Sequence, residues 1–151
     1  MIYKFSIKEK ILLSNDIIPH PFADSSYSVV LGLALGCAMK LKIADQLSIE
    51  FKDVNQIAKG ASVSEVGAEL ILDCLDALGY VQKKGTQYAL TKRGYKNLSP
   101  QSPNNFRNFI LFNDDMYKGF LQLDETIRTG KRPASNSLEQ KNEYEWELFS
   151  R

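Results

Sequence analysis

The sequence has little of what metal and redox sites need: one histidine, His20, and two cysteines, Cys37 and Cys74, among 151 residues. No Cys-x-x-Cys or histidine-rich spacing occurs, so we predict no metal site. Both cysteines stand among apolar residues, which favours small buried side chains in a reducing cytoplasm over a disulfide. His20 stands between two prolines, and we interpret it as structural or solvent-facing rather than catalytic.

Closely spaced glycines are also missing. None of the nine glycines is separated from another by a single residue, so no G-x-G loop for phosphate or adenosine can be drawn. We therefore predict no cofactor-binding and no catalytic residue in this chain. The longest apolar run, 29–39, is too short to cross a bilayer, which takes about 20 residues, and the first residues lack the apolar core of a signal peptide. We expect a cytoplasmic protein without a membrane partner.

No charge of one sign dominates, because 19 Lys and Arg against 18 Asp and Glu leave a net charge of +1. Such a balance gives no general attraction to nucleic acids. The length fits one domain with a sizeable core.

The N-terminal part divides into an arm, 1–24, and an apolar helix, 27–41, with Ser25 or Ser26 as its cap. Pro19 and Pro21 are expected to end any regular element in the arm. The helix is apolar on nearly all sides, so it needs cover, and a second copy of the chain is one source. Glycines four residues apart would let a partner helix approach. The predicted dimer-interface residues are Val29, Gly32, Leu33, Gly36 and Met39.

The segment 25–97 as a whole is predicted to be a winged helix. A capping box at 53–56 starts a short helix that Gly60 ends, and a second box at 62–65 starts a helix that runs to Leu78 before Gly79. Two helices joined by a tight turn form a helix-turn-helix. The runs 80–82 and 87–90 then predict a β-hairpin, and Thr91 caps a short turn that ends near Gly94. The fold class is therefore mainly α with a small β-hairpin wing, plus further N- and C-terminal dimerisation helices.

A winged helix first suggests DNA binding, but its charges argue against that function. No Lys or Arg occurs over 61–82, and four carboxylates of the second helix share one face within about 80°. They are Glu65, Glu69, Asp73 and Asp76. Five basic residues of the wing region compensate only in part: Lys83, Lys84, Lys92, Arg93 and Lys96. A solvated helix face explains the carboxylates better than acid–base catalysis does, and we expect no specific nucleic-acid partner.

The remainder, 98–151, is predicted to be a helical extension. A Ser-, Pro- and Asn-rich connection leads into a helix over 106–112, and Asn113 and Asp114 cap another that stops at Gly130. A loop over 131–137 precedes an element that begins near 143. An aromatic stripe follows the helices, with core packing as its default interpretation and a pocket wall as the alternative. It consists of Phe106, Phe109, Phe112, Met116, Tyr117 and Phe120.

Several runs, in this order, resemble the dimerisation domain of plant-type and bacterial S-adenosylmethionine-dependent small-molecule O-methyltransferases. The run 36–47 resembles the first helix of that domain, and 54–58 and 70–81 resemble its short helix pair. Tyr88-Ala89-Leu90-Thr91 with Gly94 is similar to its wing. The run 123–133 looks like a helix end with its loop, and Tyr144-Glu145-Trp146 is similar to the aromatic pair that precedes the catalytic domain.

The resemblance implies a homodimer in which this portion supplies a wall of the small-molecule acceptor pocket. By position, Phe112, Asn113 and Met116 match family residues that face the acceptor. S-adenosylmethionine is implied for the full-length parent, in a following domain with a Gly-rich loop, which this chain lacks. The chain alone is expected to be inactive. A stand-alone winged-helix transcription regulator that binds DNA or a small ligand is the alternative, and a regulatory partner of a full-length methyltransferase is a third reading.

Overall fold

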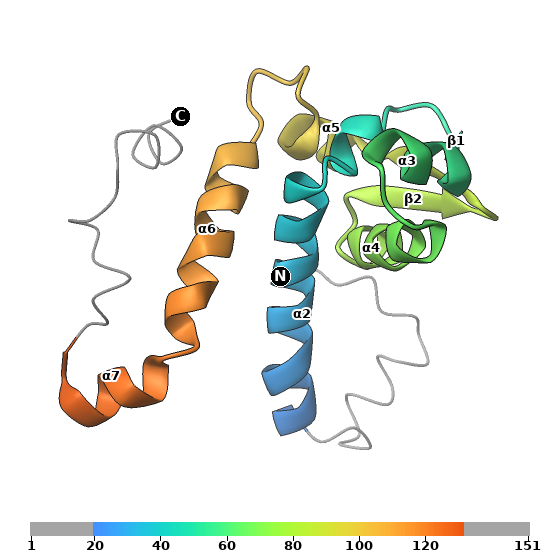
Figure 1. The fold of residues 1–151 in the computed structure, drawn as a ribbon. Helices are drawn as coiled ribbons and strands as arrows, with labels where there is room; N and C mark the ends of the chain where they lie inside the picture. The colour runs from blue at the N-terminus through green and yellow to red at the C-terminus, as the bar shows by residue number, and fades with distance from the viewer. Residues whose placement is uncertain (1–19, 132–151) are drawn as a thin grey trace. The chain divides into compact units, whose positions relative to one another are not determined.

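The computed structural model of the chain describes residues 20–131, which form a mainly helical fold with one small antiparallel sheet (Figure 1). The chain divides after Asn105 into two compact units, which are described separately. The first unit contains α2 (His20–Lys40), the 3₁₀ turn η1 (Ala44–Gln46), β1 (Lys52–Asp53), α3 (Val54–Ala61), α4 (Glu65–Ala77), β2 (Val81–Lys84), β3 (Gln87–Leu90) and α5 (Lys92–Leu98). The second contains α6 (Arg107–Phe120) and α7 (Leu123–Thr129).

Helix α2 begins seven residues earlier than the sequence predicted, so neither Ser25 nor Ser26 is its cap. Pro21 was expected to end any regular element, and that expectation was wrong, because Pro21 is the second residue of the helix. Proline is well placed there, since its fixed φ suits a helix and its missing N–H would have had no partner in the first turn. The rest of the predicted arm, residues 1–19, lies outside the described residues.

The capping box at the start of α3 is confirmed. Asp53 accepts a hydrogen bond from the backbone N–H of Asn55 at 3.0 Å, and the Gln56 side chain accepts one from the backbone N–H of Asp53 at 3.4 Å. The predicted stop at Gly60 was wrong, because the helix continues to Ala61 and ends on Ser62 in the left-handed region, with φ 57°. Gly60 instead lies against the Gln46 side chain, where a Cβ would collide with it.

The cap of α4 also differs from the prediction, since Ser64 and not Ser62 caps it, by accepting a hydrogen bond from the N–H of Gly67 at 3.1 Å. Ser62 cannot cap α4 because it is the end of α3. Gly79 follows the end of α4 with φ 77°, as predicted for a C-terminal glycine.

The sheet has the order β1-β3-β2, with both pairings antiparallel. The predicted hairpin is confirmed as β2 and β3, with Val81 opposite Leu90, Lys84 opposite Gln87, and Gly85 in the turn at φ 61°. The third strand, β1, was not predicted, because two residues are too few to show an alternating pattern. α5 also exceeds its predicted end near Gly94 and continues to Leu98.

The core of the first unit lies where α4 and the hairpin meet α3 and α5. The largest fully buried apolar and aromatic side chains among the described residues are Ile43, Ile57, Leu72, Leu75, Val81, Tyr88, Leu90 and Leu98. α2 packs against α4 (Figure 1). Each buried aliphatic side chain stabilises the fold by roughly 1.5–3 kcal/mol relative to the exposed state.

In the second unit, the predicted break at Asn113 and Asp114 was wrong. α6 runs through both residues, and the chain breaks instead at 121–122 before α7. Asn and Asp are favoured caps, but the apolar spacing of Phe109, Phe112 and Met116 continues across them and favours one helix. α7 ends at Gly130 with φ 69°, as predicted.

Candidate functional site

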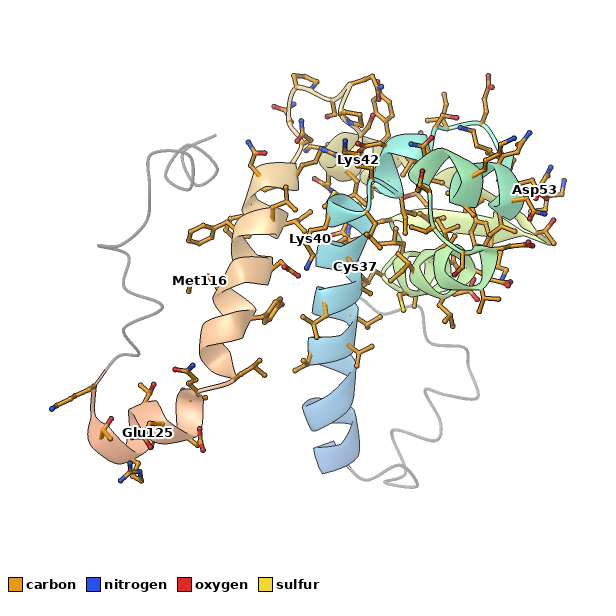
Figure 2. All side chains as sticks on the ribbon, viewed as in Figure 1. Cys37, Lys40, Lys42, Asp53, Met116 and Glu125 are labelled. Atoms are coloured by element: carbon orange, nitrogen blue, oxygen red, sulfur yellow. The ribbon has the colours of Figure 1, made fainter. Side chains whose placement is uncertain are left out.

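All three predicted pocket residues, Phe112, Asn113 and Met116, lie on α6. At about 100° per residue they fall on one side of the helix, and Phe106 and Phe109 widen the same side to an arc of about 120°. Phe106 is 55% and Phe109 49% exposed, whereas Phe112 is buried and Asn113 and Met116 are half-buried. Met116 is labelled on this helix in Figure 2. The face therefore combines aromatic rings, a thioether and one amide.

The predicted dimer-interface residues all lie on α2 but do not share one face. Val29 and Leu33 are exposed, and so are Val30 and, one residue past the end of α2, Leu41, with exposed fractions between 43% and 55%. These four fall within about 120° of the helix circumference. Gly36 and Met39 are buried and Gly32 is half-buried, on the other faces of the helix. α2 thus leaves one apolar face uncovered in the described part of the chain.

A charged cluster that was not predicted joins α4 to the hairpin. The Lys83 ammonium lies 2.8 Å from Oδ1 of Asp73 and 3.2 Å from Oε1 of Glu69. The hydroxyl of Tyr88 donates to the same Asp73 oxygen at 2.7 Å. Lys83 also lies over the Tyr88 ring, 5.2 Å from its centre. The helical spacing of the carboxylates was visible beforehand, but the register that brings Lys83 to them was not.

Electrostatics in this cluster favour the protonated forms of Lys83 and Tyr88. The hydrogen bonds of Lys83 to Asp73 and Tyr88 raise the pKa of its ammonium. Burial, followed by the effect of Asp73, raises the pKa of Tyr88 to about 12. Both Lys83, whose ammonium is held by two carboxylates, and Tyr88, whose pKa is about 12, stay protonated at neutral pH. Neither is therefore a good candidate for a general base.

A second basic residue near the hairpin, Arg93, also has partners within the chain. Arg93 lies over the Tyr80 ring at 4.6 Å, and its guanidinium donates to the carbonyl of Leu78 near the end of α4 at 3.4 Å. A cation near a helix C-terminus is favourable. Thus two of the five basic residues considered for contact with DNA already have partners within the chain.

Asp53 connects two elements, at the far edge of the first unit in Figure 2. Besides capping α3, it accepts a hydrogen bond from the Thr86 hydroxyl at 2.8 Å, and this bond, with that from the Asn55 N–H, lowers the pKa of the carboxyl. The backbone N–H of Val54 donates to the carbonyl of Thr86 at 3.0 Å. These contacts fix the hairpin turn to α3 and give Asp53 a structural role.

Cys37 and Cys74 are both free and half-buried, and burial raises the pKa of the Cys74 thiol. Within 20–131, no group of three or more His, Cys, Asp or Glu side chains is arranged to hold a metal ion. No helix among the described residues is long and apolar enough to cross a membrane.

No family model and no curated protein matches the sequence. Solved structures do match. Human N-acetylserotonin methyltransferase, solved with SAM, superposes with a TM-score of 0.64 over 99% of this chain and 42% of its own, at 21% identity. CalO1, a methyltransferase of calicheamicin biosynthesis, gives a TM-score of 0.70 over 97% of this chain and 44% of its own, at 18% identity.

The O-methyltransferase NcsB1 of neocarzinostatin biosynthesis, solved with SAM and 2-hydroxy-5-methyl naphthoic acid, gives a TM-score of 0.58 at 26% identity. That match covers 77% of this chain and 36% of NcsB1, so the chain spans less than half the length of each of these proteins. The resemblance is thereby confirmed at the level of the fold, because this chain has the fold of a part of these O-methyltransferases.

Proposed function

We propose that this chain is the dimerisation and acceptor-pocket part of an S-adenosylmethionine-dependent small-molecule O-methyltransferase. The observation that carries the proposal is the extent of the structural match: CalO1 and the human enzyme cover nearly all of this chain, yet it spans only 44% and 42% of them. In this proposal α3, α4 and the β2–β3 hairpin are a winged helix used for assembly, and the protein acts in the cytoplasm without specific nucleic-acid binding.

Methyl transfer itself requires residues beyond this chain. No G-x-G spacing exists among its nine glycines, so we expect no adenosine loop here. The chain alone should neither bind S-adenosylmethionine nor methylate an acceptor. Titration calorimetry with the cofactor tests this, and micromolar binding would contradict it.

The proposed dimer forms through the exposed apolar face of α2. Val29, Val30 and Leu33 are each left in water to 43–55%, and burying such side chains gains roughly 1.5–3 kcal/mol each when burial is complete. Of the other three residues predicted for the interface, half-buried Gly32 would allow close approach of a partner helix, whereas Gly36 and Met39 are buried within the chain and would support this face from inside.

Sedimentation velocity at micromolar concentration tests the dimer. We expect the unmodified chain to sediment as a dimer and Leu33→Glu to raise the dissociation constant at least about tenfold, because a carboxylate would be buried without a partner. Ile49→Glu is the matched control, since Ile49 is also an exposed apolar residue, at 66%, but lies outside α2. A monomeric unmodified chain would rule the dimer out.

The acceptor is proposed to contact α6 through Phe112, Asn113 and Met116. Aromatic rings on one helix face suit a planar apolar acceptor, with the Asn113 amide available to a polar substituent. NcsB1 was solved with such a molecule, a hydroxynaphthoic acid. In the full-length parent, Phe112→Ala should raise the KM for the acceptor while leaving the affinity for S-adenosylmethionine unchanged. Equal losses of both would assign Phe112 to folding instead.

A further inference from the structure

Charge is unevenly distributed around α6. The side of this helix that carries Phe106, Phe109, Phe112, Asn113 and Met116, which we call the α6 face, spans about 120° and contains no charged residue. The charged residues of α6 all fall on the other side, within an arc of about 100° that begins at least about 60° from the α6 face. They are Arg107, Asp114, Asp115 and Lys118. A molecule that contacts the α6 face therefore meets rings, a thioether and an amide, but no formal charge.

The described side chains of α6 follow the same division. Phe106 and Phe109 are 55% and 49% exposed, so these two rings are accessible to a ligand. Arg107 is half-buried and Asp114 is buried, and each already has an interaction within the chain. Neither of these two charges is therefore placed to neutralise an ion on the α6 face.

The charge of the α6 face decides which polar groups a ligand can bring to it. A carboxylate that leaves water for an apolar surface is strongly destabilised unless a cation or several hydrogen-bond donors face it. The only polar side chain of the α6 face is the Asn113 amide, which can donate hydrogen bonds and accept them but carries no charge. One amide can satisfy a neutral hydroxyl or carbonyl group, because such a group needs only one or two partners.

We propose that the acceptor is an uncharged aromatic molecule with a hydroxyl or carbonyl group at Asn113, and that the α6 face selects against carboxylic acids. This inference rests on the proposed function, whose acceptor it restricts to one charge class. It distinguishes this chain from NcsB1, which was solved with a naphthoic acid.

Titration of the chain with 2-naphthol and with 2-naphthoate tests the proposal. At pH 7 a phenol is neutral and a carboxylic acid is ionised, so the two probes share one ring system and differ in charge. Two-dimensional ¹H–¹⁵N NMR with assigned backbone signals reports both the binding site and the dissociation constant. We expect 2-naphthol to shift amide signals of α6 between Phe106 and Met116, with a dissociation constant at least about fivefold lower than that of 2-naphthoate.

The NMR titration separates failure of this inference from failure of the proposed function. Equal dissociation constants of both probes on α6, or tighter binding of 2-naphthoate, would overturn the charge preference and leave the proposed acceptor contact in place. Shifts confined to other elements, or binding of neither probe, would contradict the acceptor contact itself and overturn this inference with it.

A cation introduced on the α6 face supplies a second test. Asn113→Lys should reverse the preference, so that 2-naphthoate binds more tightly than 2-naphthol, because the carboxylate gains a counter-ion. The control Gln122→Lys adds the same charge at an exposed residue between α6 and α7, outside the α6 face, and should leave both dissociation constants unchanged. The dispersion of the amide signals verifies that both variants remain folded. An unchanged ratio of the two constants in folded Asn113→Lys would refute selection by the charge of this face.

Discussion

The hydroxyl of Tyr88 donates a hydrogen bond to Oδ1 of Asp73 across 2.7 Å, and so ties the middle of β3 to the outer side of α4. The ring of Tyr88 is fully buried. This places a polar end of a core side chain on a carboxylate that also holds Lys83. Tyr88 and Lys83, from the two strands of the hairpin, thus both contact Oδ1 of Asp73 on α4.

Replacing Tyr88 by Phe should lower the free energy of unfolding by roughly 1–2 kcal/mol, because a charge-assisted hydrogen bond is lost while the packing of the ring is kept. Urea denaturation followed by circular dichroism measures the change. Tyr95→Phe is the control, since Tyr95 is 41% exposed and should change stability little. Equal effects of the two variants would show that the Tyr88–Asp73 bond contributes nothing.

Stability should fall at alkaline pH because of the same cluster. Tyr88 and Lys83 both have raised pKa values in the folded chain, that of Tyr88 about 12. The folded state therefore keeps protons that the unfolded state releases, so this stabilisation is complete below about pH 10 and is lost as pH rises toward 12. Thermal unfolding between pH 8 and 11.5 should show the decline, and Tyr88→Phe should make it shallower. A decline of unchanged slope in Tyr88→Phe would place its origin elsewhere.

Gly94→Ala should be among the most damaging small substitutions. A Cβ at Gly94 would overlap the carbonyl oxygen of Tyr80 and lie 2.8 Å from its carbonyl carbon, and backbone cannot rotate away. We expect a loss of roughly 2–3 kcal/mol in unfolding free energy, in the upper range for overpacking. In Gly67→Ala the new Cβ meets only the Ser64 hydroxyl, and the gain in helix propensity offsets the contact. Differential scanning calorimetry measures the melting temperatures of Gly94→Ala and Gly67→Ala. Similar melting temperatures for the two variants would contradict the predicted overlap at Gly94.

Two serines on either side of the α3–α4 turn should respond in opposite directions. Ser62 has φ 57°, so Ser62→Gly should stabilise the chain by roughly 0.5–1 kcal/mol. Ser64 caps α4, so Ser64→Ala should destabilise it by about 1 kcal/mol. Chemical denaturation of the two variants in parallel measures both signs. Destabilisation by Ser62→Gly would indicate that its side chain has a role beyond the backbone.

Acid should weaken the contact between α3 and the hairpin turn. The pKa of Asp53 is lowered by its hydrogen bonds to Thr86 and Asn55, so its stabilising effect is present above the unfolded pKa of about 3.9 and is lost as pH falls through the lower folded value. Asp53→Asn should therefore unfold with a weaker pH dependence between pH 4 and 2. Thr86→Val removes only one of the two bonds and should lie between Asp53→Asn and the unmodified chain.

Much of the fold could be predicted from the sequence where a local rule decides the outcome. Asp53 with Gln56, Gly79 and the Gly85 hairpin each follow from capping or turn chemistry, and all three are confirmed. Local rules failed where tertiary contacts decide. Glycine commonly ends a helix, but Gly60 lies within α3, where the absence of a side chain leaves room for Gln46. Asn113 lies within α6 because the aromatic residues on both sides of it share one helix face.

The candidate site could be predicted only in outline. Phe112, Asn113 and Met116 were chosen from the family resemblance, and they share one helix face only because α6 continues through Asn113, where the sequence predicted a break. Their contact with an acceptor remains a prediction. The cluster of Lys83, Asp73 and Tyr88 could not be predicted from the sequence. Lys83 and Tyr88 lie 10 and 15 positions after Asp73, and the hairpin register that brings them to it cannot be read from local patterns.

The pairing of Lys83 with Glu69 and Asp73 also bears on how such a scaffold could change its partners. Proteins gain much of their affinity for nucleic acids when free lysines displace the cations condensed on phosphates. Lys83 is already neutralised by α4, so it has little to exchange. Loss of Glu69 and Asp73 would return this charge to the solvent, beside Lys84 on the same strand. Two substitutions would thus free Lys83 for contact with phosphates, while Glu65 and Asp76 would remain on the same face of α4.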